Sequence, residues 1–386
     1  IEEATTQEIM VMNAYAISQN ADKNMANMLD DLAGVSTIKN GTNIAKPVVN
    51  GLYGDRLILL NNGVTQSGQQ WGADHSPEID PLAAGKITVI KGVSALAYQG
   101  SNLGSAILVS PPKIDSEPHF HGKVRYFFQS NGLGNGLNIR VQKHHQKFAW
   151  SLVGTAKKKG DSRAASYYLT NTGAVEGDFA LQTEYKHNAS LKSELFFSSF
   201  NAHLGVLRGA HIGNLTDLEE ALARSEPFYT KDQLSYQIKS PYQKINHHLL
   251  KWNTAYLLNE DHKFDFTYAV QWDLRKEFDV RRSGRSVKPA MSLNQTSYFS
   301  EIKYKGYLSS DWEVSSGVQL NRKDNYNEPG TGILPLIPDY ISFETGLFVM
   351  ALKKSEQFSF ELGGRYDYLD QRVATISRDV VKEIKR

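Results

Sequence analysis

The residues best suited to chemistry lie close together in the segment 69–80. Trp71 is followed by the adjacent pair Asp74 and His75, and then by Glu78. Imidazole and carboxylate groups together are ligands that suit zinc. We therefore predict ligand binding by these four residues, with Asp74 and His75 as metal ligands. The alternative is that Asp74 caps a turn and His75 packs against the wall of the surrounding protein.

Further metal ligands must come from elsewhere in the chain, which has 11 histidines. His203 and His211 lie in or near a long polar connection, and we predict that they complete the metal site. Adjacent histidines such as His247 and His248 would point to opposite faces of a strand, which weakens their case as a pair.

The composition excludes several classes of protein. With no cysteine, disulfides, iron–sulfur clusters and thiol catalysis are ruled out. A net charge of +2 gives no reason to expect a nucleic-acid partner. No nucleophile elbow or catalytic carboxylate pair is apparent, so we expect neither an enzyme nor a resident cofactor. The first residues show no signal sequence, and we expect a mature or truncated product.

The elements that position these residues change in character near residue 113. Before it, short mixed segments predict an α+β domain over 1–112. Apolar residues at helical spacing predict a helix over 22–32, with Asp22 as its N-cap and Gly34 closing it. We also expect short strands near 48–49, 56–60 and 86–90, and a turn at 61–63.

From residue 113 to 386, long segments alternate between apolar and polar residues. Leu137, Ile139 and Val141, for example, are separated by polar side chains. We count about twelve such segments, many near the roughly 9–11 residues that a tilted strand needs to cross a bilayer. Short turns near 131–135, 143–146 and 353–357 alternate with longer connections. The longest, 201–244, contains a predicted helix over 215–224, with Thr216 or Asp217 as its N-cap. The pattern favours a transmembrane β-barrel; a soluble sandwich or solenoid is the alternative.

Three blocks of the first domain, in order, give a more specific indication. Residues 28–36, 46–64 and 80–98, followed by a strand at 103–109, resemble the plug domain of TonB-dependent outer-membrane receptors. Residues 330–340 and 362–367 resemble strand-flanking motifs of the same receptors. The chain departs from the family pattern at three positions, Asn50, Gln99 and Ser105.

This resemblance implies an α+β plug domain followed by an antiparallel transmembrane β-barrel in the outer membrane of a Gram-negative bacterium. Such barrels close with about 22 strands, so we expect about half a barrel here, either as a fragment or with the missing strands supplied by an assembly. The implied partners are the TonB-ExbB-ExbD energy-coupling complex, outer-membrane lipids and a metal or metal chelate.

The resemblance leaves the cargo open. An iron chelate, either a siderophore or haem, is the usual substrate of the family. The zinc-uptake branch carries an Asp-His pair at a similar place in its plug, so Asp74 and His75 make zinc an alternative. A third possibility is a surface-binding protein that does not transport.

Overall fold

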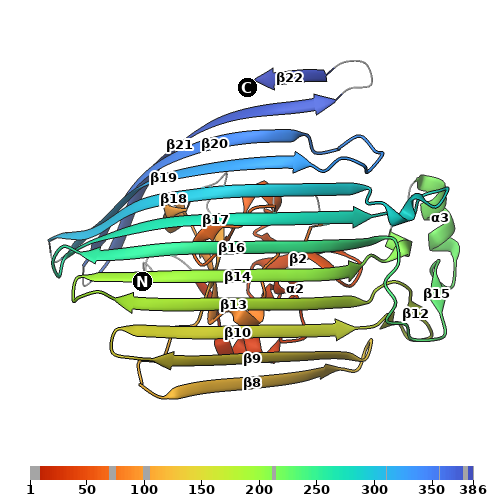
Figure 1. The fold of residues 1–386 in the computed structure, drawn as a ribbon, viewed down its shortest axis with the longest axis horizontal. Coiled ribbons are helices and arrows are strands. Elements are labelled where there is room, and N and C mark those ends of the chain that lie inside the picture. Colours follow the sequence, from red (N-terminus) through yellow and green to blue (C-terminus); the bar gives the residue numbers. More distant parts are fainter. Residues whose placement is uncertain are drawn as a thin grey trace.

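The computed structural model describes residues 9–68, 75–98, 105–210, 214–309, 311–355, 357–376 and 381–385. A small α+β domain comes first in the chain and is followed by a large antiparallel sheet. In Figure 1 the small domain, in red and orange, lies behind the sheet. We call these parts the plug domain (β1 to β7) and the barrel sheet (β8 to β22, without the small strands β11, β12 and β15).

The plug domain is built on a five-stranded sheet with the order β1-β6-β7-β4-β5, in which β4 and β7 are parallel. A separate hairpin, β2–β3, and two short helices, α1 and α2, complete it. Its apolar core contains Met28, Leu29, Ile87 and Ile107, all fully buried. The elements are β1 (Met10–Asn13), α1 (Ala14–Gln19), α2 (Met25–Leu29), β2 (Val35–Asn40), β3 (Ile44–Val49), β4 (Ile58–Asn61), β5 (Val64–Thr65), β6 (Lys86–Lys91) and β7 (Ser105–Ser110), with short 3-10 turns η1 (Gly54–Arg56), η2 (Pro81–Ala83) and η3 (Val93–Ala97).

The predicted helix over 22–32 is shorter than expected. It covers Met25–Leu29, and its N-cap is Asn24, whose side chain accepts a hydrogen bond from the Asn27 N–H at 2.9 Å. Asp22 is therefore not the cap. Gly34, with φ of 71°, lies in the turn that leads into β2. The predicted turn at 61–63 is confirmed: Asn62 and Gly63 both have positive φ, as a tight hairpin turn requires.

The barrel sheet has 12 strands among the described residues, with β8 at one edge and β22 at the other. Neighbours along the chain pair antiparallel throughout, so the predicted alternation of strands and turns is confirmed. The strands are β8 (Phe120–Gln129), β9 (Gly134–His144), β10 (Phe148–Lys159), β13 (Ala174–Lys186), β14 (Leu191–Gly205), β16 (Tyr242–Leu257), β17 (His262–Phe278), β18 (Met291–Ser309), β19 (Trp312–Asn327), β20 (Asp339–Lys354), β21 (Ser359–Ile376) and β22 (Val381–Lys385).

The two ends of the barrel sheet differ in their connections. The turns near 145–147, 258–261 and 355–358 lie at one end. The long connections 160–173, 206–241, 279–290 and 328–338 all lie at the other, which we call the loop end. The turn near 131–135 also lies at the loop end, since it joins β8 to β9. In Figure 1 the loop end is on the right, where α3 (Leu215–Ala223), β12 (Tyr168–Leu169) and β15 (Thr230–Lys231) lie. The two small strands form a three-stranded sheet with β11 (Ser162–Arg163), and a last 3-10 turn, η5 (Arg285–Val287), follows β17.

The helix predicted over 215–224 is present as α3. Its N-cap is Asn214, which accepts a hydrogen bond from the Asp217 N–H at 2.9 Å, rather than Thr216 or Asp217. Among the described residues, no helix is both long and apolar enough to cross a membrane.

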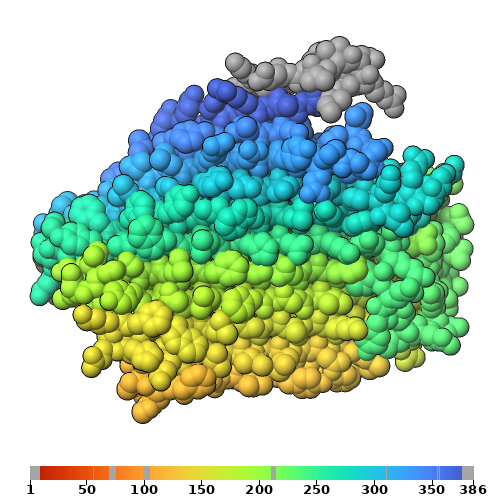
Figure 2. Space-filling view, in the orientation of Figure 1, coloured from red at the N-terminus to blue at the C-terminus, as the bar shows by residue number. Residues whose placement is uncertain are grey.

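Side chains of the barrel sheet alternate between a face toward the plug and an outer face. On β9, Asn138 is 3% exposed, whereas Leu137 and Ile139 are 40% and 42% exposed. The outer face, seen in Figure 2, is formed by the barrel strands, and the plug is hidden behind them. At one point on the inner face Val64 of the plug packs into an apolar cluster of the sheet that comprises Val153, Ala180, Phe196, Leu249, Ala269 and Phe299.

Candidate functional site at the boundary of plug and barrel

Only some of the predicted site residues lie in the part of the chain that the structure describes. Trp71, Asp74 and His211 lie outside the described residues. His75 and Glu78 are both described, in the extended segment that follows, and both are buried, with 5% and 2% exposure. Ser76 between them fixes this segment to the plug, because its hydroxyl accepts a hydrogen bond from the Ala45 N–H at 2.9 Å.

His75 contacts the inner wall of the barrel sheet near the loop end. Its Nε2 lies 2.9 Å from Oε1 of Glu277, the penultimate residue of β17. Burial lowers the pKa of His75, and the nearby charge of Arg275 adds to this, while Glu277 acts in the opposite direction. A cavity of about 140 Å³ lies beside Glu277 and is also lined by Asn40 and Gln243.

Glu78 is the most strongly held of the predicted residues. One carboxylate oxygen pairs with the Arg275 guanidinium of β17, and the other lies 2.6 Å from Nδ1 of His247 on β16. Burial by itself would raise the pKa of Glu78, but Arg275 and His247 outweigh it and hold the pKa at about 2. The plug therefore presents an ionised carboxylate to two basic groups of the barrel wall.

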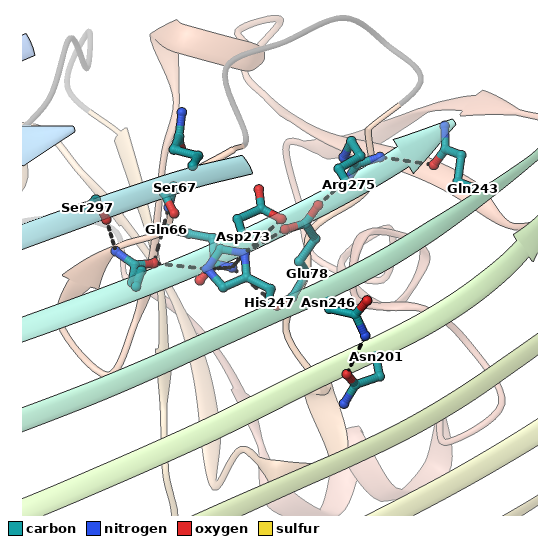
Figure 3. A network of polar contacts seen from close by, with 12 residues as sticks. Gln66, Ser67, Glu78, Asn201, Gln243, Asn246, His247, Asp273, Arg275 and Ser297 are labelled. Atoms are coloured by element: carbon teal, nitrogen blue, oxygen red, sulfur yellow. Dashed lines mark hydrogen bonds and ion pairs between the residues drawn. The ribbon is translucent and has the colours of Figure 1, made fainter. Parts of the chain in front are cut away.

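The contacts continue along the inner face as a polar network, shown in Figure 3. Gln66 of the plug lies 3.1 Å from Nδ1 of His247, and the Ser67 N–H donates to Gln271 at 3.2 Å. Gln271 in turn donates to the Thr65 carbonyl at 2.9 Å and to Ser297 at 3.2 Å. Plug backbone and barrel side chains are thus joined directly at several points.

A second polar cluster joins the plug to β10. The Thr155 hydroxyl donates to Asp80 at 2.6 Å, and Lys157 lies between Asp80 at 3.9 Å and Glu176 at 3.2 Å. Burial raises the pKa of Asp80, although Lys157 and Thr155 act against this. Together with Glu78, this cluster makes the segment 75–80 the main electrostatic contact between plug and barrel.

His203 does not lie with His75 and Glu78. It is on β14, where the alternate residues Ala202 and Leu204 are buried toward the plug. Its ring packs edge-on against Tyr242 at 4.8 Å, and its register partner Lys244 is exposed. His203 is therefore on the outer face of the sheet, away from the predicted plug ligands.

Four functional candidates on the barrel side were not among the predicted site residues: His247, Asp273, Arg275 and Glu277. The last three, with Gln271, form a run of polar residues at every second position of β17, all directed toward the plug. Such a run marks the inner face of a barrel strand. The alternation of polar residues along β17 could have identified Asp273, Arg275 and Glu277 as inward-facing. It could not have shown which plug residue each of them contacts.

Comparison with known proteins gives a family match for the plug domain and similar structures for the whole fold. Residues 2–106 match the family described as TonB-dependent Receptor Plug Domain. The whole fold is similar to the ferric citrate transporter FecA in the unliganded form, with a TM-score of 0.71 and 12% identity over 98% of this chain and 58% of that one. The ferric-catecholate import receptor Fiu from E. coli K12 gives a TM-score of 0.73 and 13% identity over 99% and 64% of the two chains.

A third similar structure is the ferripyoverdine receptor of the outer membrane of Pseudomonas aeruginosa bound to ferripyoverdine, with a TM-score of 0.69 and 14% identity over 99% of this chain and 53% of that one. The chain thus spans between 53% and 64% of the length of these three proteins. Residues 2–106 therefore match the plug domain of TonB-dependent receptors, and the chain as a whole has the fold of these three receptors. This family is one of receptors rather than enzymes, in agreement with the sequence-based expectation.

Proposed function

We propose that the protein is a TonB-dependent receptor for the energy-coupled uptake of a scarce metal or metal chelate across a Gram-negative outer membrane. One observation carries this proposal: the plug segment 75–80 is held to the inner barrel wall by ion pairs and hydrogen bonds, just below the loop end. A plug held by such contacts closes the lumen at rest and is released by mechanical work.

The similar structures support a metal chelate as cargo, because their names refer to ferric citrate, ferric catecholate and ferripyoverdine. The exposed apolar side chains of the outer face, among them Val124 at 69% and Ile139 at 42%, support contact with outer-membrane lipids. The energy would come from the TonB-ExbB-ExbD complex acting on the plug.

The test is uptake in cells that carry the full-length protein as their sole receptor. We expect radioactive iron to accumulate from at least one ferric chelate, and accumulation to stop when TonB is deleted. Uptake that continues without TonB would contradict energy coupling. Failure of every ferric citrate, catecholate, hydroxamate and haem source would remove the iron-chelate assignment.

A second candidate cargo is the zinc ion, bound at the predicted Asp74 and His75 pair. It is supported by the contact of His75 with Glu277 at 2.9 Å, which brings an imidazole and a carboxylate together below the loop end. Zinc uptake that is lost in both Asp74→Ala and His75→Ala, with unchanged amounts of receptor in the membrane, would favour this candidate over an iron chelate.

A further inference from the structure

Three polar groups surround Nδ1 of His247 at the boundary of plug and barrel (Figure 3). Oε2 of Glu78 lies 2.6 Å away, Nε2 of Gln66 3.1 Å and Oδ1 of Asp273 3.9 Å. All four residues are buried, with exposures between 2% and 4%. One ligand atom each from Glu78, His247 and Asp273 lies within 4.8 Å of the other two.

Two oxygens of this group are left without a partner. Oδ1 of Asp273, which faces His247, accepts no hydrogen bond from the described part of the chain, and neither does Oε1 of Gln66. A buried acceptor that stays unsatisfied costs about 1–3 kcal/mol, and more when it is charged. Each of these two oxygens therefore lacks a positively charged or donor atom beside it.

The charges around the group also favour a bound cation. Three carboxylates, those of Glu78, Asp273 and Glu277, are balanced by one guanidinium, that of Arg275, which contacts Glu78 and Glu277. With His75 neutral and His247 protonated on both nitrogens, toward Glu78 and Gln271, negative charges exceed positive ones by one, and by two once His247 has given up its Nδ1 proton. An uncompensated charge is costly in a buried place, and a divalent cation would cancel this excess.

We infer that Glu78, His247 and Asp273 bind a divalent first-row transition-metal ion such as Zn²⁺, with the amide oxygen of Gln66 as fourth ligand. Two carboxylates, an imidazole and an amide oxygen form a donor set for ions of this class. Bonds of about 2.0–2.1 Å in a tetrahedron place ligand atoms about 3.3 Å apart. The 2.6 Å and 3.9 Å separations lie on either side of that value.

Binding requires two local changes. His247 gives up the proton on Nδ1 to solvent, because the metal takes the place of that proton between His247 and Glu78. The Gln66 amide turns over, so that Oε1 replaces Nε2 beside the ring, and the 3.2 Å hydrogen bond from Nε2 to the Glu78 carbonyl is given up. Gly68 lies beside the site with a positive φ of 74°. A Cβ there would clash with Oδ2 of Asp273, so glycine lets the plug backbone approach this closely.

This inference goes beyond the proposed function. Two of the ligands belong to the plug and two to the barrel sheet, so an ion bound here joins the two parts whichever cargo is carried. Binding can also be measured in the purified protein without energy coupling. Loss of this site and loss of uptake are therefore separate outcomes.

The experiment is a calorimetric titration of the purified full-length protein in detergent with Zn²⁺. The variants are His247→Gln and Asp273→Asn, and the matched control is His248→Gln, since His248 is the adjacent histidine on the opposite face of β16. We expect both site variants to bind Zn²⁺ at least about tenfold more weakly than the wild type, and His248→Gln to bind it as the wild type does. A fourth variant, His75→Gln, reports on binding at the plug apex.

Unchanged binding in both site variants would overturn the inference, even if His75→Gln loses binding, as would a wild type that binds no Zn²⁺. If both variants fail to fold, the inference is tested by titrating the wild-type protein with Co²⁺. We then expect the intense visible absorption of four-coordinate Co²⁺. X-ray absorption spectroscopy should detect one imidazole ligand. A spectrum of hydrated Co²⁺ alone would overturn the inference.

Discussion

Glu78 of the plug and His247 of the barrel sheet meet with their Oε2 and Nδ1 atoms 2.6 Å apart, 169 residues from each other in the chain. The same carboxylate pairs with Arg275 through its other oxygen. A single plug side chain therefore contacts two neighbouring strands, β16 and β17. Its removal affects both contacts at once, which makes Glu78 the best position for testing how the plug is held.

Glu78→Gln should lower the free energy of unfolding by about 3–5 kcal/mol, because it leaves the fully buried Arg275 without its main counter-charge. The double variant Glu78→Gln/Arg275→Met should recover part of this loss, since it removes the unpaired guanidinium, although Glu277 then loses its 3.6 Å contact with Arg275. Denaturant titration of the protein in detergent measures both. Additive losses in the double variant would show that the two residues act independently.

The contribution of Glu78 should also depend on pH. Its pKa is held at about 2 in the folded protein, against 4.5 for an ordinary glutamate. A carboxyl with a lowered pKa stabilises the folded state fully above its unfolded pKa and progressively less as the pH falls toward the folded one. The contribution, about 3 kcal/mol, should therefore be constant above about pH 5 and shrink between about pH 4.5 and 2.

The measurement is the difference in unfolding free energy between wild type and Glu78→Gln at a series of pH values. This difference removes the contribution of every other titrating group whose pKa the substitution leaves unchanged. A difference that stays the same down to about pH 3 would mean that Glu78 is not ionised by its partners.

Asn43 should fix the β2–β3 hairpin of the plug to the barrel near the loop end. Its Nδ2 lies 3.0 Å from the carbonyl oxygens of Thr172, Gly173 and Gly205. Asn43→Asp would direct a carboxylate oxygen at these acceptors and should accelerate amide hydrogen exchange in β2 and β3 by about 5- to 100-fold, equivalent to about 1–3 kcal/mol. The exposed Asn50→Asp is the control, and equal exchange in the two variants would refute the role of Asn43.

The two faces of β9 should respond differently to a charge. Ile139 is on the outer face and Asn138 faces the plug, where its side chain donates to Thr155 at 2.8 Å. Ile139→Lys should reduce membrane assembly, because a lysine facing lipid costs about 2–4 kcal/mol at the midplane. Asn138→Lys should assemble normally but hold the plug less firmly. Heat-modifiable migration on gels measures assembly, and equal assembly of both variants would exclude the lipid-facing assignment of Ile139.

Much of the fold could be predicted because it follows from local patterns. The alternation around Leu137 and Ile139 defines a strand with two unlike faces, and Asn62-Gly63 defines a tight turn. The helix caps were predicted less well: Asn24 and Asn214 cap α2 and α3, where nearby aspartates or a threonine were expected. These side chains have similar cap preferences, so the sequence alone does not separate them.

The candidate site was less predictable because it depends on contacts between distant segments. His75 and Glu78 could be singled out by residue type, but the partners Glu277, Arg275 and His247 lie about 170 to 200 residues later. Only the register of β16 and β17 and the depth of the plug bring them together. His203 illustrates the same limit, since a shift of one residue along β14 would have turned it toward the plug.

The polar run at every second position of β17 has a thermal consequence. When the plug moves away from this wall, the surfaces that become wet are mainly carboxylate, guanidinium and amide groups, and the apolar contact at Val64 is small beside them. Exposure of polar surface lowers the heat capacity while exposure of apolar surface raises it. The two effects partly cancel, so the enthalpy of releasing the plug should vary little with temperature, and a cell growing in the cold would meet nearly the same energetic balance as one growing in the warm.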